Sequence, residues 1–105
     1  MKKLSLLILV LLTACTNSTK VVFLGDSITE AGESKEGDGT YKGFITLLKE
    51  DVGQDMELIN KGIGGNKVSD LLLRYKQDVL DLKPDIVFIY IGINDVWHKY
   101  DWGTG

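Results

Sequence analysis

The chain has 105 residues, with 15 acidic and 12 basic side chains and a formal net charge of −3 at pH 7. This length allows one small domain at most. The acidic balance, without a basic patch, argues against nucleic acid as a partner, and we expect none.

The first residues have the layout of an export signal. Lys2 and Lys3 form a short basic segment, and the run "LSLLILVLL" that follows is apolar but too short to span a bilayer as a helix. Small residues then lead up to Cys15. We therefore predict that residues 1–14 are a signal peptide, whose removal would leave a more acidic mature chain.

The segment "LTAC", residues 12–15, resembles the lipobox of bacterial lipoproteins. The resemblance implies cleavage just before Cys15 and a diacylglyceryl group on its sulfur, and hence an exported protein anchored to a membrane of the bacterial cell envelope. The alternative is an ordinary signal peptide with an incidental cysteine. Because Cys15 is the sole cysteine, it has no internal disulfide partner, which favours lipidation. Residues 15–20 would then be the lipidated cysteine and a polar tether, and residues 21–105 the domain.

Three apolar segments alternate with two amphipathic ones along this domain. The expected strands are "KVVFLG" (20–25), "MELIN" (56–60) and "DIVFIYIG" (85–92). A helix is predicted within residues 41–53, where Gly53 is a plausible stop. Its apolar side chains at helical spacing are Phe44, Leu47, Leu48 and Val52.

A second helix is predicted over residues 66–82, and Pro84 ends it. Its apolar side chains form a broad stripe, made of Val68, Leu71, Leu72, Tyr75, Val79, Leu80 and Leu82. Apolar strands that alternate with amphipathic helices indicate an α/β fold with a parallel sheet covered on both faces. If the two helices lie on opposite faces, right-handed crossovers give strand order 2-1-3, the start of a flavodoxin-like three-layer α/β/α domain.

Each predicted strand ends in a polar turn that contains glycine. These turns are "GDSIT" (25–29), "NKGIGGN" (60–66) and "GIND" (92–95). In parallel α/β sheets, ligands bind beyond the carboxyl ends of the strands, near the point where the strand order reverses. The three turns should therefore meet where such a fold places its site.

In this order and spacing, the three turns resemble the sequence blocks of the SGNH, or GDSL-type, hydrolase family. The resemblance implies that Ser27 is a nucleophile and that its backbone N–H, the Gly65 N–H and the Asn94 side chain stabilise the oxyanion. It also implies that Asp26 and Asp95 brace these loops through hydrogen bonds to backbone amides. The family needs no metal or cofactor, so we expect neither.

Other interpretations of the same residues remain open. Ser27 could be a helix cap, since Glu30 follows at the spacing of a capping box. Gly65 could serve only a tight turn, and Asn94 could be a turn residue with a local hydrogen bond. A phosphate-binding turn at "GIGGN" is also possible. The α/β-hydrolase elbow and the dinucleotide fingerprint fail on spacing, because Thr29 and Lys67 occupy their required glycine positions.

The family pattern breaks in one respect. Its general base and the acid that orients that base come from a separate Asp-x-x-His block near the carboxyl end of the domain, and no such block follows the third turn in this sequence. The sole histidine, His98, follows Asn94 by four residues. Asp95 precedes it at the Asp-x-x-His spacing but belongs to the third turn, so we expect His98 to be a surface or cleft residue rather than the base. We interpret the chain as an amino-terminal fragment, with a naturally short lipoprotein as the alternative.

The sequence thus predicts a serine ester hydrolase whose substrate is a small-molecule or glycan ester and whose membrane contact is the lipid on Cys15. Acetylated glycans, lysophospholipids and thioesters all remain possible substrates, because a fold does not determine its substrate. The alternative function is a catalytically silent lipoprotein that binds carbohydrate or an acyl ligand through the aromatic residues near Trp97 and Trp102.

Overall fold

The computed structural model describes residues 17–32 and 42–103. The predicted signal peptide, residues 1–14, and Cys15 lie outside the described residues. Among the helices that are described, none is both long and apolar enough to cross a bilayer.

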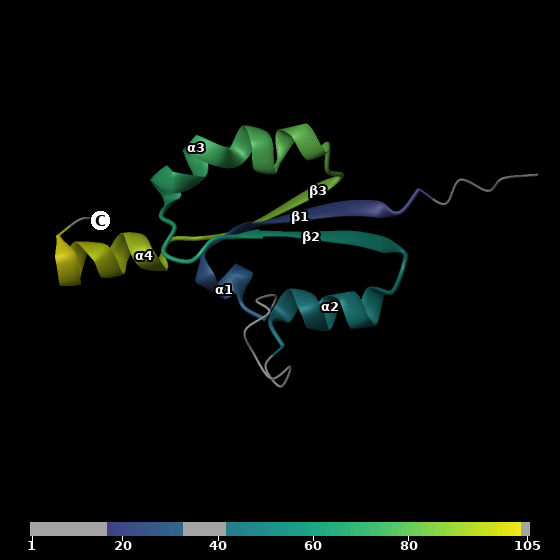
Figure 1. The fold of residues 1–105 in the computed structure, drawn as a ribbon, viewed down its shortest axis with the longest axis horizontal. Coiled ribbons are helices and arrows are strands. Elements are labelled where there is room, and N and C mark those ends of the chain that lie inside the picture. Colours follow the sequence, from purple (N-terminus) through teal and green to yellow (C-terminus); the bar gives the residue numbers. More distant parts are fainter. Residues whose placement is uncertain (1–16, 33–41, 104–105) are drawn as a thin grey trace, which may run out of the picture.

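The described segments form three strands and four α-helices in alternation (Figure 1). The strands are β1 (Thr19–Gly25), β2 (Met56–Gly62) and β3 (Ile86–Tyr90). The helices are α1 (Ser27–Glu30), α2 (Phe44–Val52), α3 (Val68–Asp78) and α4 (Ile93–Trp97). A 3₁₀ turn over Leu80–Leu82 follows α3, and α4 continues as a π-helical turn over His98–Trp102.

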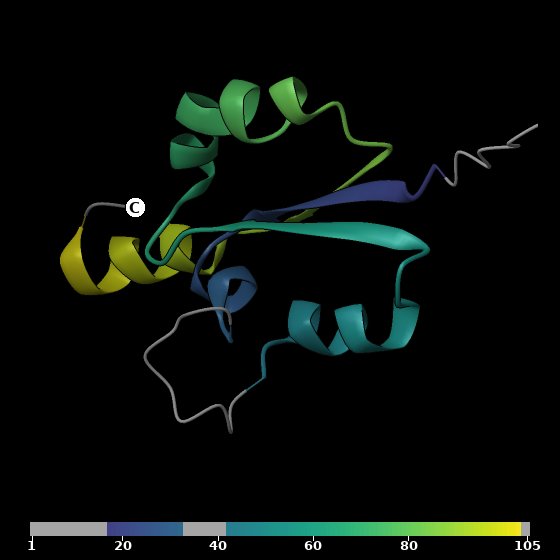
Figure 2. The ribbon, with the colours of Figure 1, turned by 45° about the vertical axis from the view of Figure 1, so that its right-hand side comes forward.

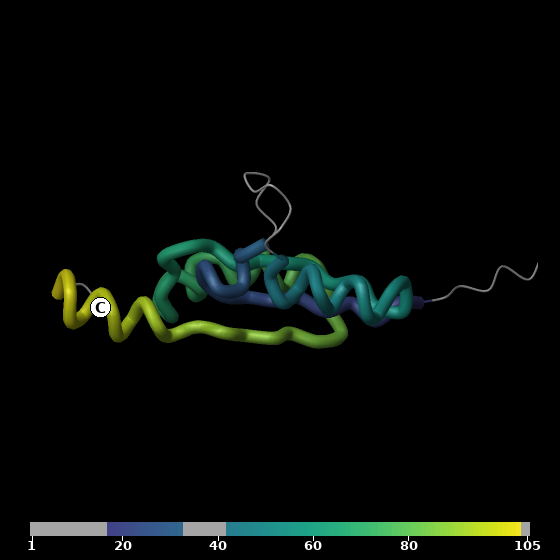
Figure 3. The backbone as a smooth tube through the Cα atoms, turned by 90° about the horizontal axis from the view of Figure 1, so that it is seen from below, coloured from purple at the N-terminus to yellow at the C-terminus, as the bar shows by residue number. Residues whose placement is uncertain are grey.

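The strands form one parallel sheet in the order β2-β1-β3. Helix α3 covers one face, and α1 and α2 cover the other (Figures 1 and 2). The predicted three-layer α/β fold and its strand order are therefore confirmed. Strand β3 is an outer strand, and α4 continues beyond its carboxyl end (Figure 3).

Strand β1 supplies side chains to two small cores, because successive residues of a strand point to opposite faces. Val22 and Leu24 pack with Leu71 and Val79 on the α3 face. On the other face, Val21 and Phe23 pack with Ile45, which is fully buried. The central strand is thus covered on both sides, as its apolar sequence predicts.

The predicted apolar face of the helix at 41–53 is wrong in detail. Ile45 is buried, whereas Leu47 and Leu48 are exposed. Leu47 follows Ile45 by two residues, which is roughly 200° around a helix with 3.6 residues per turn, so the two side chains cannot share a face. The face that packs on the sheet includes Phe44, whose ring lies 5.9 Å from that of Phe23.

The second helix is shorter than predicted, and a further helix begins within the predicted third turn. Helix α3 ends at Asp78, four residues before the predicted end at residue 82. Val68, Leu72 and Tyr75 in α3 are exposed, so only part of the predicted apolar stripe contacts the sheet. Residues 93–102, which include most of the third turn, are helical.

Candidate active site

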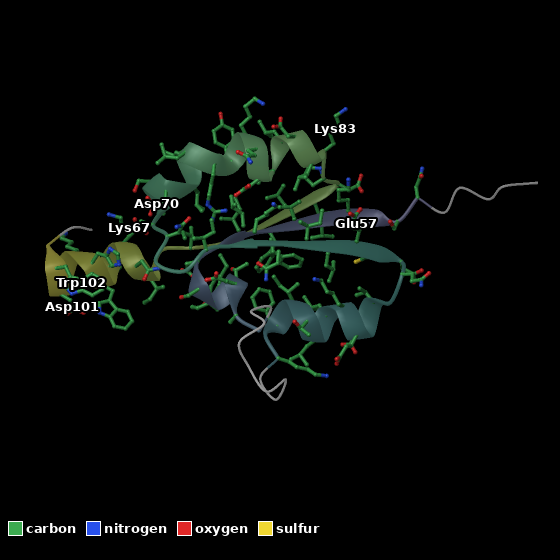
Figure 4. The ribbon with its side chains drawn as sticks, viewed as in Figure 1. Glu57, Lys67, Asp70, Lys83, Asp101 and Trp102 are labelled. Carbon is green, nitrogen blue, oxygen red and sulfur yellow. The ribbon has the colours of Figure 1, made fainter. Side chains whose placement is uncertain are left out.

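The three glycine-containing turns begin at one level of the sheet. In the strand register, Gly25 lies opposite Gly62 in β2 and opposite Tyr90 in β3. The turns that follow these residues therefore emerge side by side at the carboxyl edge. Figure 4 shows the start of α3, with Lys67 and Asp70, at this edge, and Glu57 and Lys83 at the opposite one.

Ser27 is the first residue of α1 and is exposed at this edge. The residue that caps α1 is Asp26, whose buried carboxylate accepts a hydrogen bond of 2.9 Å from the Ile28 N–H. The interpretation of Ser27 as the helix cap is therefore wrong. An N-terminal cap satisfies a backbone N–H that has no partner within the helix, so Asp26 stabilises the turn that presents Ser27.

The first turn requires glycine at position 25. A Cβ atom on Gly25 would lie 2.5 Å from the Tyr90 carbonyl oxygen and 2.2 Å from Thr29 Oγ1. Both distances are far below van der Waals contact. Gly25 therefore allows β1, β3 and α1 to approach closely, and this approach fixes the place of Ser27.

The second turn lies directly beside Ser27. A Cβ atom on Gly64 would be 3.7 Å from the Ser27 Cβ, and the Gly64 N–H donates a hydrogen bond of 2.7 Å to the Glu30 carboxylate. Gly65 has a φ of +79°, a conformation that side chains with a Cβ rarely adopt, and nothing lies within 4 Å of where its Cβ would be. Gly65 therefore combines the backbone freedom of glycine with an open surface.

The third turn is joined to the second by side-chain hydrogen bonds. Asn94 Nδ2 donates to the Asn66 carbonyl oxygen at 3.0 Å, a contact between residues that are 28 positions apart. Both Asp95 carboxylate oxygens accept from the Val68 N–H, at 3.1 and 3.3 Å. The Asn94 contact is therefore not the local turn bond of the alternative interpretation.

His98 lies in the π-helical turn after α4, where its ring packs edge-on against Trp102 with 4.6 Å between centroids. Trp102 is at the end of this helix that projects beyond the sheet (Figure 4). No hydrogen bond between Ser27 and His98 occurs among residues 17–32 and 42–103. In that same part of the chain, no group of three or more His, Cys, Asp or Glu side chains is arranged to hold a metal ion.

A small pocket of about 70 Å³ opens between the first and third turns. Its lining is mostly apolar and consists of Asp26, Ile28, Tyr90, Ile91 and Ile93. Two of these residues, Asp26 and Ile28, flank Ser27 in the sequence. The pocket offers room for a group of a few heavy atoms close to the Ser27 turn.

Three residues that hold the turns together were not predicted. Glu30 binds the Gly64 N–H, as described above. Asn60 donates to the Thr29 carbonyl at 2.7 Å and accepts from the Gly62 N–H at 2.8 Å. Arg74 of α3 donates to carbonyl oxygens of two strands.

The sequence offers one signal for the role of Arg74. It is a cation within the leucine-rich segment "DLLLRYKQD", and a charged side chain in such a segment is rarely buried without partners.

Comparison with known proteins assigns the chain to a family of lipases and acylhydrolases. The model of the GDSL-like lipase/acylhydrolase family matches residues 23–104, and the chain belongs to that family. It is 44% identical over 92 residues to an acetylxylan esterase of Geobacillus stearothermophilus, an alignment that covers 78% of this chain and 42% of that enzyme. It is also 37% identical over 76 residues to the "Uncharacterized lipoprotein YqeF" of Bacillus subtilis, covering 71% and 31% of the two chains.

Solved structures agree with this assignment. The crystal structure of the acetyl xylan esterase AlAXEase matches with a TM-score of 0.69 and 50% identity, covering 82% of this chain and 43% of that one. LAE5, an alpha/beta hydrolase from the metagenome of Lake Arreo in Spain, matches with a TM-score of 0.69 and 38% identity, covering 85% and 47%. The chain thus spans less than half the length of these relatives.

Proposed function

We propose that the protein is a serine ester hydrolase, and that its substrates are acetyl esters of carbohydrates. The observation that carries the proposal is the meeting of the Ser27, Gly65 and Asn94 turns at one sheet edge, in a chain of the GDSL-like family. The relatives named as acetylxylan esterases support the acetyl group and the glycan. The pocket lined by Asp26 and Ile28, the sequence neighbours of Ser27, is of a size that suits a small acyl group.

In the proposed reaction, Ser27 Oγ attacks the acyl carbonyl carbon and the alcohol leaves, which gives an acyl-enzyme that water then hydrolyses. The oxyanion accepts hydrogen bonds from the Ser27 N–H, the Gly65 N–H and Asn94 Nδ2. An asparagine amide carries two N–H groups, and the contact with Asn66 occupies one of them, which leaves the second for the oxyanion. Preformed donors of this kind lower the barrier because they need no reorganisation during the reaction.

The proton of Ser27 needs a base, and the family resemblance assigns that role to a histidine of an Asp-x-x-His block. His98 is not proposed for this role, because it packs on Trp102 at the far end of the helix. The experiment therefore uses the complete gene product. Turnover of p-nitrophenyl acetate and of acetylated xylooligosaccharides should fall by on the order of 10⁴-fold in Ser27→Ala. Equal rates for the wild type and this variant would contradict the proposal.

A lipid anchor at Cys15 is the second part of the proposal, with residues 1–14 as the signal, 15–20 as the tether and 21–105 as the domain. It is supported by the "LTAC" segment and by similarity to a protein named as a lipoprotein. A palmitate label should enter the wild-type protein but not Cys15→Ser, and only the wild type should sediment with membranes. An unlabelled wild-type protein in the soluble fraction would refute the anchor.

Binding of a glycan without catalysis is a second candidate function. Its support is the exposure of three aromatic side chains on the last helix, namely Trp97, Tyr100 and Trp102. Aromatic faces exposed in this way can stack on sugar rings. Quenching of tryptophan fluorescence by xylooligosaccharides, in a wild-type protein that shows no turnover dependent on Ser27, would favour this candidate over the hydrolase.

A further inference from the structure

The side chain of Arg74 makes an unusually complete set of hydrogen bonds beneath the three turns. Its side chain is 15% exposed, and all three guanidinium nitrogens donate. The acceptors are the carbonyl oxygens of Gly25 (2.9 Å) and Lys61 (2.8 Å), the side-chain oxygen of Asn66 (2.8 Å) and the carboxylate of Asp78 (2.8 Å).

These acceptors belong to the parts of the chain that carry the proposed catalytic groups. Gly25 is the last residue of β1 and precedes Ser27 by two positions. Lys61 is the second-to-last residue of β2, close to the glycines of the second turn. Asn66 ends that turn, and its own carbonyl oxygen binds Asn94 Nδ2. Arg74 therefore contacts the first and second turns directly and reaches the third through one residue.

The chemistry of the site requires arginine. A guanidinium is planar and presents five N–H donors in fixed directions, whereas a lysine ammonium is a compact point charge. Asp78, one helical turn further along α3, binds the same guanidinium and is itself only 16% exposed in its side chain. This pair holds the guanidinium in one orientation and balances its charge where water is largely excluded.

We propose that Arg74 is a positioning residue for ester hydrolysis: it sets the separation between the Ser27 turn and the turns that carry Gly65 and Asn94. This inference rests on the proposed function. Arg74 does not reach the substrate; it acts through Gly25, Asn66 and the chain between them. A displacement of about 1 Å between a nucleophile and its oxyanion donors can cost on the order of 100-fold in rate. Loss of Arg74 should therefore lower kcat much more than it raises KM.

The test uses the complete gene product with Arg74→Lys, Arg74→Met and Arg74→Ala, and with Lys76→Met as the matched control. Lys76 lies on the same helix and pairs with Asp81, but its side chain is 76% exposed. We expect kcat on p-nitrophenyl acetate to fall roughly 100-fold in Arg74→Met and to stay low in Arg74→Lys, with KM changed less than about threefold. Lys76→Met should keep the wild-type kcat.

Two further measurements separate positioning from folding. Circular dichroism gives the folded fraction of each variant, so that kcat is compared per folded molecule. Millimolar guanidinium should restore part of the activity of Arg74→Ala by filling the vacated site, and should leave Lys76→Met unchanged. A rise in kcat per folded molecule supports positioning, whereas a rise only in the folded fraction would mean that Arg74 serves stability alone.

The outcomes distinguish this inference from the proposed function. If Ser27→Ala matches the wild-type rate, the proposed function fails and the role of Arg74 falls with it. If Ser27→Ala is inactive while folded Arg74→Met keeps the wild-type kcat, or loses activity through KM alone, the positioning role is overturned and the hydrolase stands.

Discussion

The Glu30 carboxylate accepts a hydrogen bond of 2.7 Å from the Gly64 N–H, across the carboxyl edge of the sheet. Glu30 is one helical turn after Ser27 in α1, and Gly64 is next to Gly65 in the second turn. The contact thus joins the helix of the proposed nucleophile to the loop of a proposed oxyanion donor. It also occupies the Gly64 N–H, so that the N–H of Gly65 is the one left for a substrate.

Glu30→Ala should therefore loosen the second turn. A hydrogen bond to an exposed carboxylate contributes about 1 kcal/mol, which corresponds to a fall in kcat/KM of roughly five- to tenfold. Glu30→Gln should retain most of the activity, because its amide oxygen still accepts the bond. Steady-state kinetics on p-nitrophenyl acetate provide the measurement, and equal losses in the two variants would disagree with this explanation.

Asn94→Asp tests Asn94 as a hydrogen-bond donor, because both its bond to the Asn66 carbonyl and its proposed bond to the oxyanion need an N–H. Aspartate is as good a turn former as asparagine but cannot donate a hydrogen bond when ionised and would repel an oxyanion. If Asn94 stabilises the oxyanion, Asn94→Asp should lose at least as much kcat as Asn94→Ala, about 100- to 1000-fold. A near-normal kcat in Asn94→Asp would contradict a role for the Asn94 amide in stabilising the oxyanion.

Gly62 should be intolerant of any side chain. A Cβ atom there would lie 2.2 Å from the Glu30 nitrogen and 2.8 Å from the Asp26 carbonyl oxygen, and backbone atoms cannot move aside as a side chain can. We expect Gly62→Ala to lower the free energy of unfolding by about 3 kcal/mol or more. Urea denaturation measures this quantity.

Gly53→Ala is the matched control for Gly62→Ala. Gly53 also has no side chain, but its φ is +58° and nothing lies within 4 Å of where a Cβ would be. Only the backbone strain should count, at about 1–3 kcal/mol, because a φ of +58° with a ψ of −130° is a conformation that residues with a Cβ rarely adopt. A larger loss for Gly53→Ala than for Gly62→Ala would show that close packing at the sheet edge is not the dominant cost.

The structure buries Ile45 of α2, whereas the sequence pattern predicted that Leu47 would be buried, and mutation of the two residues distinguishes these arrangements. Ile45 is fully buried against β1, so Ile45→Ala should cost about 2–5 kcal/mol in the free energy of unfolding. Leu47 is 49% exposed, so Leu47→Ala should cost well under half of that. Thermal or urea unfolding of the two variants decides which face of α2 meets the sheet, and the reverse order would contradict the structure.

The strands and their order could be predicted because the apolar runs at Val21–Leu24 and Ile86–Tyr90 leave few alternatives for a small chain. The three turns could be located because glycine marks each of them. The helix that begins at Ile93 was missed, since "GIND" is typical of a turn and Trp97, Tyr100 and Trp102 do not form a buried stripe. In α3, an apolar pattern that runs on to Leu82 hid the break after Asp78.

Arg74 could not be assigned from the sequence for a different reason. Three of its four acceptors lie outside α3, and two of these three are backbone carbonyl oxygens, which every residue has. The sequence therefore shows a cation in an apolar segment but does not show which groups it contacts. The sequence does not show the partner of Glu30 either, because that partner is the backbone N–H of a glycine.

The bond from Arg74 to the Gly25 carbonyl joins residues 49 positions apart. During synthesis, the segment with Ser27 is therefore made well before the side chain that holds its turn. Because the entropy of closing such a loop must be met before the contact forms, the turn can reach its final shape only after α3 has docked on the sheet. A chain that ended before Arg74 would contain the whole "GDSIT" motif and still lack the support that gives the motif its shape.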